Sequence, residues 1–323
     1  MADAFATPAQ LAAQWRTLTA AESEAAASHF DTVASLIRTE FRERAGLDDV
    51  PADLSGSADY RRRVGAAIVA PLTERGHRQA AAMAARGVRL VVSGLVPSPW
   101  SQAAKGLFRV AGVPVLAVRA AREDPELRAW TSSHNVPVVL HDDEPPRTSW
   151  SDIVMLADGL APGVLLAPEI DRRMRTIALL HELAGERGLG WNARLLMIEA
   201  GLHGEGERGF PRPVAHYLAG KYGHAAERVA VARARGRAQL AALERELGAR
   251  EFFGDAGPDA LDVYTACFLT ILEPLSEADC PRMAPALRRA FLVAHEELGD
   301  AVSESLVAHQ RRMRAVLGWP IAL

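Results

Sequence analysis

The chain has 323 residues, of which 49% are hydrophobic and 24% charged; this balance excludes a mostly disordered or low-complexity protein. Its formal net charge of −3 argues against a dedicated nucleic-acid-binding protein, because affinity for phosphate needs a surplus of cations. With only Cys267 and Cys280 present, we expect no disulfide framework, and a cytoplasmic location fits. No secretion signal and no apolar run long enough to span a membrane is recognised, so no membrane partner is expected.

The first 87 residues carry only helical patterns. Thr19-Ala20-Ala21-Glu22 matches a capping box, and the helix face that follows it runs until Gly46 offers a stop. Further helical spacing appears over residues 60–68 and 77–85. The sequence therefore predicts a helical extension over residues 1–87.

The pattern changes at Gly87. Short β-branched runs at 88–92, 113–118 and 136–140 alternate with helical spacing at 98–111, after Pro125, and around Ile153. Strands that alternate with helices are typical of an α/β layer. The sequence predicts such a domain over residues 88–160.

Beyond this domain the strand signals end. Residues 161–168 look like a linker, and helices are predicted at 171–187, 191–200, 228–247, 259–272 and 301–316. No fixed-period repeat is seen, which sets solenoids aside. An all-helical domain is expected over residues 169–323.

Five short motifs follow one another along the chain in an order that is informative about the family. They are Pro97-Ser98-Pro99-Trp100-Ser101, Asn135-Val136-Pro137-Val138-Val139, Ser149-Trp150-Ser151-Asp152-Ile153, Gly188-Leu189-Gly190-Trp191, and the stretch from Phe253 to Val263. In this order, residues 88–323 resemble the cytosolic glutathione S-transferase superfamily, and more closely its bacterial glutathione S-transferase-like members. The resemblance implies a thioredoxin-like domain followed by a helical domain, with a cleft between them. It also implies that glutathione binds as a substrate. The spacing of the histidines gives no reason to expect a metal.

The resemblance places the sulfur of glutathione at the start of the first α/β helix. A transferase must stabilise the thiolate, because the thiolate is the nucleophile, and Ser98 at this helix start is the first candidate. Ser101 is the alternative hydroxyl, and Trp100 is expected beside the ligand. A serine before a proline is also an ordinary helix cap, so capping alone would explain Ser98-Pro99.

Two further segments are expected to hold the rest of the tripeptide. Val136-Pro137 would be a cis-proline turn that presents main-chain groups to the ligand, although a proline opening an edge strand is the simpler alternative. At Ser149-Trp150-Ser151-Asp152 the resemblance places the γ-glutamyl carboxylate, with Ser151 as hydroxyl donor and Asp152 close by. The family has an acidic residue before the serine, whereas here Trp150 precedes Ser151 and Asp152 follows it, and Asp152 is equally explained as part of a helix cap.

The helical domain offers three candidates for a second substrate. Trp191, Arg194 and Tyr217 are expected either to line an apolar acceptor pocket or to bind a carboxylate, against the alternative of ordinary packing. Cys267 is expected in the core, and the scattered histidines show no metal spacing.

The leading hypothesis is glutathione-dependent transfer to a small electrophile, with a homodimer as a candidate assembly. A non-catalytic binding or scaffold protein of the same fold is the alternative. Residues 1–80 also resemble, faintly, the small helical head–tail adaptor proteins of phages, which keeps a phage structural component open.

Overall fold

The computed structural model describes residues 82–83, 85–93, 98–120, 124–204, 207–280 and 283–319. The expected helices before residue 82 and the faint adaptor-like segment lie outside these residues, as does Pro97. Residues 86–117 and 131–323 form one compact unit. Residues 118–130, which include most of the helix α6 (Pro125–Thr131), group with a separate unit.

The first described elements alternate as predicted. In chain order they are β1 (Val88–Ser93), α5 (Pro99–Val110), β2 (Val115–Ala120), α6 (Pro125–Thr131), β3 (Val138–His141) and α7 (Trp150–Leu160). The sheet has the order β2-β1-β3, and β3 runs antiparallel to β1, with Val88 opposite His141 and Val91 opposite Val138. An isolated antiparallel bridge joins Val139 to Arg147 beyond β3. This arrangement is the predicted thioredoxin-like layer.

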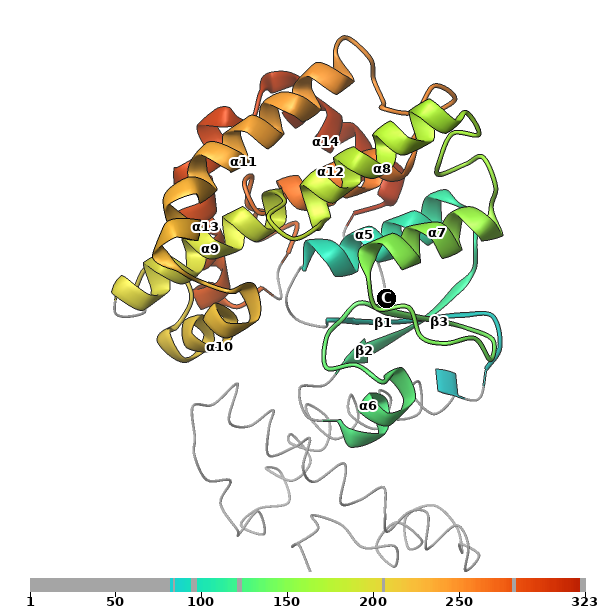
Figure 1. Ribbon diagram of the computed structural model, residues 1–323, viewed down its shortest axis with the longest axis horizontal. Helices are drawn as coiled ribbons and strands as arrows, with labels where there is room; N and C mark the ends of the chain where they lie inside the picture. The colour runs from blue at the N-terminus through green and yellow to red at the C-terminus, as the bar shows by residue number, and fades with distance from the viewer. Residues whose placement is uncertain are drawn as a thin grey trace, which may run out of the picture. The chain divides into compact units, whose positions relative to one another are not determined.

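Helices α5 and α7 lie side by side on one face of the sheet, with further helices beyond them (Figure 1). The residues of β1 from Val88 to Val92 are all buried, as expected for a strand whose two faces are both covered. Gly106 in the middle of α5 has no room for a larger residue, because an added Cβ would lie 2.6 Å from Val263 Cγ1. The first α/β helix is thus packed tightly against the helical domain.

Every described element after α7 is helical. These elements are α8 (Ile170–Ala184), α9 (Leu189–His203), α10 (Arg212–Tyr222), α11 (Ala226–Leu247), α12 (Ala260–Leu269), α13 (Pro285–Leu298), the 3-10 turn Gly299–Ala301 and α14 (Glu304–Leu317). The fold class expected for residues 88–323 is therefore confirmed. The boundaries of the two domains, 88–160 and 169–323, remain a proposal.

Two of these helices were not predicted. In each, a proline at the first helical positions starts the helix: Pro213 in α10 and Pro285 in α13. Helix α10 ends at Gly223, whose φ of 59° is left-handed, and a glycine of this kind is an ordinary helix stop. Helix α13 also has helical apolar spacing, at Leu287, Phe291, Ala294 and Leu298, so the sequence holds enough signal to predict it.

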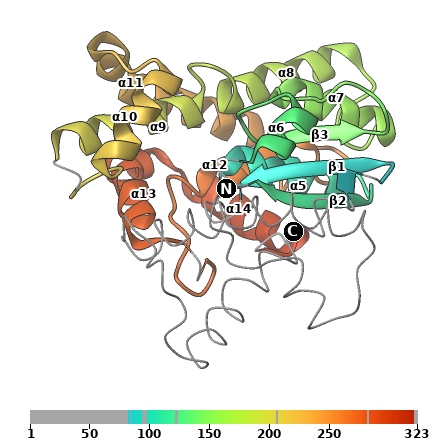
Figure 2. The same ribbon diagram turned by 90° about the horizontal axis from the view of Figure 1, so that it is seen from below.

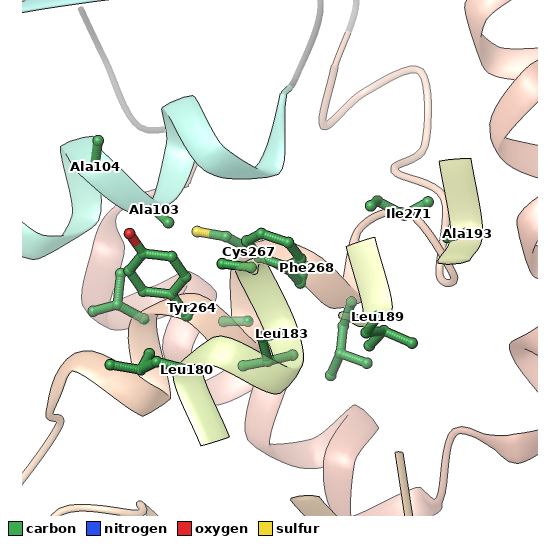
Figure 3. Close-up of a cluster of buried hydrophobic side chains, with 14 of the residues drawn as sticks. Ala103, Ala104, Leu180, Leu183, Leu189, Ala193, Tyr264, Cys267, Phe268 and Ile271 are labelled. Atoms are coloured by element: carbon green, nitrogen blue, oxygen red, sulfur yellow. The ribbon is translucent and has the colours of Figure 1, made fainter. Parts of the chain in front are cut away.

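Helix α9 lies at the centre of the helical domain, packed against α8, α10, α11 and α13 (Figure 2). Ten of its residues are buried, spread around the whole helix, and a helix that is apolar on all sides belongs in an interior. Helix α12 joins the two layers of the unit by packing against α5, α8 and α14. Figure 3 shows this core, with Ala103 of α5 pointing toward Tyr264 and Cys267 of α12.

The predicted linker is fixed at both of its buried leucines. The backbone N–H of Ala260 donates to the carbonyl of Leu165, at 3.0 Å. The backbone N–H of Leu166 donates to Oδ1 of Asp158, at 3.2 Å, and Arg173 forms an ion pair with the other oxygen of Asp158. The linker is therefore hydrogen-bonded both to α7 of the α/β layer and to α12 of the helical domain.

The capping box predicted at Asp259 is confirmed. Its carboxylate accepts from the backbone N–H of Leu261 and of Asp262, and the Asp262 side chain accepts from the N–H of Asp259. Asp262 also accepts hydrogen bonds from the N–H groups of Phe253 and Gly254 and from His309. The side chains of Asp262 and His309 are both fully buried. The capping box therefore fixes three segments of the chain as well as the start of α12.

Candidate functional site

Ser98 is the N-cap residue of α5. Its backbone is extended, with φ −67° and ψ 121°, and Pro99 opens the helix behind it. The side chain makes no capping hydrogen bond, and the residue is half-buried. Helix capping was the competing explanation for this serine, but its hydroxyl does not cap the helix. The hydroxyl stands instead at the positive end of a twelve-residue helix.

Ser101, the alternative hydroxyl, lies in the interior. It has no exposed surface, and its Oγ accepts from the backbone N–H of Ser93 at 3.3 Å and lies 3.2 Å from the Ser93 hydroxyl. These bonds join the end of β1 to the first turn of α5. A hydroxyl that contacts a bound thiol must be accessible, so Ser98 is the better placed of the two serines.

Trp100 fastens α5 to the helical domain. Its indole Nε1 donates to the carbonyl oxygen of Ala184 at 2.9 Å, and its ring meets Phe268 edge-on, with centroids 4.9 Å apart. It also faces Tyr222, at 6.4 Å. These contacts explain Trp100 by packing, and Gly190 opposite it must stay small because an added Cβ would lie 2.9 Å from Trp100 Cη2.

The peptide bond between Val136 and Pro137 is cis, as expected. Pro137 is buried and Val136 half-buried. The ladder between β1 and β3 begins at Val138, paired with Val91, so Val136 lies just before it.

The start of α7 has the predicted cap. Ser149 Oγ accepts from the backbone N–H of Asp152 at 3.1 Å, and it lies 2.9 Å from the hydroxyl of Ser151. Ser151 is half-buried, and Trp150 packs edge-on against Tyr264 with centroids 6.4 Å apart. Ser151 therefore stands at a helix N-terminus, where carboxylates are favoured, while Trp150 faces the helical domain.

Asp152 faces a different part of the surface. It lines an open hollow of about 430 Å³ together with His141, Glu144, Arg147 and Met155. His141 Nδ1 lies 2.9 Å from Glu144, and Arg147 forms an ion pair with the same carboxylate, so both lower the pKa of Glu144. None of the other predicted site residues lines this hollow.

Arg194, in α9, is the predicted acceptor residue whose surroundings are least ordinary. Only 5% of it is exposed, and its guanidinium lies over the rings of Phe210 and Phe291, at 5.4 and 5.1 Å. The guanidinium also donates a hydrogen bond to the Tyr222 side chain, and burial lowers the pKa of Arg194. Sequence reasoning missed Tyr222, whose role depends on Arg194 and Trp191 in another helix.

The other two acceptor candidates play different parts. Trp191 donates from Nε1 to the carbonyl of Tyr222 at 2.9 Å and stacks edge-on against its ring, at 4.7 Å. Tyr217 is 58% exposed on α10. Trp191 thus positions Tyr222, and Tyr217 lies at the surface.

Cys267 is a core residue, as predicted. It has no exposed surface, and burial raises the pKa of its thiol, which keeps it neutral and unreactive. Within the described residues, no group of three metal-binding side chains comes together. No helix among them is both long and apolar enough to cross a membrane.

No protein-family model matches the sequence, and no curated protein matches it. Solved structures of glutathione transferases do resemble the chain. One from Xanthobacter autotrophicus Py2 has 17% identity and a TM-score of 0.45, covering 73% of this chain and 96% of its own. One from Pseudomonas putida, solved with glutathione disulfide, has 15% identity and a TM-score of 0.47, covering 73% and 89%.

A Tau class glutathione S-transferase from mango has 18% identity and a TM-score of 0.41, covering 70% of this chain and 97% of its own. The likeness of residues 1–80 to phage adaptor proteins finds no support in these comparisons. The ligands named for those structures belong to those proteins.

Proposed function

We propose that this protein is a glutathione transferase-like enzyme that joins the thiolate of glutathione to a small electrophile. The observation that carries the proposal is Ser98: its half-buried hydroxyl stands at the positive end of α5 and is not used as a cap. A donated hydrogen bond and a helix N-terminus both favour thiolate over thiol. A bound thiol would therefore lose its proton to solvent more readily.

The reaction forms one bond and breaks one. The sulfur lone pair attacks an electrophilic carbon of the acceptor, and the leaving group departs with the electron pair of its bond to that carbon. Ser98 donates its hydrogen bond to the sulfur while it carries charge. The role assigned to this residue is thus to lower the pKa of the bound thiol.

Two other segments are proposed to hold the tripeptide. Val136 lies beyond the β1–β3 ladder, which leaves its main chain suited to pairing with the ligand backbone. The N-terminus of α7, with Ser151, is proposed to receive the γ-glutamyl carboxylate, because unpaired amides and the helix dipole attract anions there.

A non-catalytic binding protein is the alternative. It is favoured by the order Trp150-Ser151-Asp152, which lacks an acid before the serine. The two functions differ in whether replacing Ser98 changes the rate of glutathione conjugation.

The test is titration calorimetry with glutathione and a conjugation assay on Ser98→Ala and Ser101→Ala. Loss of one hydrogen bond to a charged sulfur should lower the conjugation rate about 10- to 100-fold and raise the pH at which the rate reaches half its maximum. Ser101→Ala should lower stability but leave the rate of the folded protein within about threefold, since its bonds are internal. Absence of glutathione binding by the wild-type protein would refute the enzyme.

A further inference from the structure

Arg194 carries a positive charge in the interior of the helical domain. It is 5% exposed, and among the residues that the structure describes no carboxylate lies within ion-pair distance of it. Its polar neighbours are neutral: the sulfur of Met197, 3.8 Å from Nη1, and the hydroxyl of Tyr222. A buried cation without an anion is energetically unfavourable, and no carboxylate of the described residues neutralises this one.

A second cation adds to the same surplus. Lys221, at the end of α10, places Nζ 5.9 Å from the centroid of the Tyr222 ring. The pKa of Lys221 is lowered by burial first and then by the charge of Arg194. No acidic side chain in the described part of the chain pairs with Lys221 either. One bound anion would relieve both costs, and Lys221, which reaches the surface, marks the side from which it enters.

The pair lies close to the proposed thiol site. The ring of Tyr222 is 6.4 Å from that of Trp100, which follows Ser98 by two residues. Trp191 holds Tyr222 from its other side. Tyr222 therefore contacts both Arg194 and Trp100, which lies in the first turn of α5.

The walls around the guanidinium are apolar. The rings of Phe210 and Phe291 both lie close to it, and Met197 is fully buried beside it. Such walls favour an organic acid with an apolar body over a small hydrated ion, and the planar guanidinium fork matches a carboxylate.

We propose that Arg194, assisted by Tyr222 and Lys221, binds the carboxylate of the acceptor, so that the electrophile is an apolar organic acid. The identification of the ligand as the acceptor rests on the proposed transferase function. The carboxylate site itself does not depend on that function.

The experiment uses a matched pair of aromatic electrophiles, 4-chloro-3-nitrobenzoate and its methyl ester. Calorimetry on the full chain without glutathione measures binding alone. The acid should bind at least about tenfold more tightly than the ester, and Arg194→Met should remove this preference. The control Arg212→Met, at an exposed arginine of α10, should retain it. If Arg194→Met fails to fold, Arg194→Lys and Tyr222→Phe replace it, each with an expected loss of about three- to tenfold for the acid alone.

Several results would overturn the inference. They are equal binding of acid and ester, no binding of either up to about 10 mM, a preference that the Arg194 variants retain, and displacement of the acid by inorganic phosphate at equal concentration. A separate titration with glutathione keeps the two proposals apart. If glutathione fails to bind while the acid preference depends on Arg194, the transferase is refuted and the carboxylate site stands.

Discussion

Replacing Asp262 by asparagine should destabilise the protein severely. The carboxylate is fully buried and accepts four hydrogen bonds. Oδ1 accepts from Phe253 at 2.9 Å and from His309 at 2.7 Å, and Oδ2 accepts from Gly254 at 3.1 Å and from Asp259 at 2.9 Å. An amide keeps one acceptor oxygen and turns two N–H groups toward groups that are themselves donors.

The expected loss follows from these contacts. Two hydrogen bonds to a charged acceptor are lost, at about 1.5–3 kcal/mol each, and the displaced donors remain buried. The free energy of unfolding should therefore fall by about 3–5 kcal/mol. With a urea slope of about 2–3 kcal/mol per molar, the midpoint should fall by about 1.5 M.

The measurement is urea unfolding at pH 7.5, followed by tryptophan fluorescence, because Trp150 packs against Tyr264 of the same helix α12. Asp171→Asn is the control, since Asp171 is exposed in the first turn of α8 and should change stability by less than about 0.5 kcal/mol. A loss below about 1 kcal/mol for Asp262→Asn would show that the buried carboxylate does not hold these segments together, against the reasoning from its four donors.

Two further predictions concern the same core. Gly190→Ala should cost about 1–3 kcal/mol, because the new Cβ meets the Trp100 and Phe268 rings, whereas Gly220→Ala, with nothing within 4 Å, should stabilise by about 0.5–1 kcal/mol through helix propensity; equal urea midpoints for the two variants would contradict the packing described at Trp100. Burial first, and then the charge of Asp262, raises the pKa of Asp259 to about 7. This group therefore contributes stability that is full below its unfolded pKa near 4 and is lost as pH rises through 7. Melting temperatures at pH 5 and pH 8 should show a smaller difference for Asp259→Asn, which keeps the capping oxygen, than for wild type, and an unchanged difference would exclude Asp259 as the titrating group.

Much of the fold follows from local patterns in the sequence. The capping boxes at Ser149 and Asp259 use residues three apart, and the strands at Val88 and Val138 are β-branched runs, so each is encoded within a few neighbouring positions. The cis bond before Pro137 was expected from the order of the motifs rather than from the dipeptide, since most such bonds are trans. Helix α13 was not predicted, although a proline start and regular apolar spacing both mark it in the sequence.

The roles of individual side chains depended on partners far away in the sequence. Ser98 and Ser101 look alike in the sequence, as hydroxyls near a helix start. In the structure Ser101 is hydrogen-bonded to the end of β1, whereas the Ser98 side chain makes no capping hydrogen bond. Trp100 became an anchor because Ala184, 84 positions later, accepts its hydrogen bond. Arg194 is buried because α13 brings Phe291 over its guanidinium. Periodicity reports which face of a helix is apolar, but which residues meet across that face is set by the packing of whole elements.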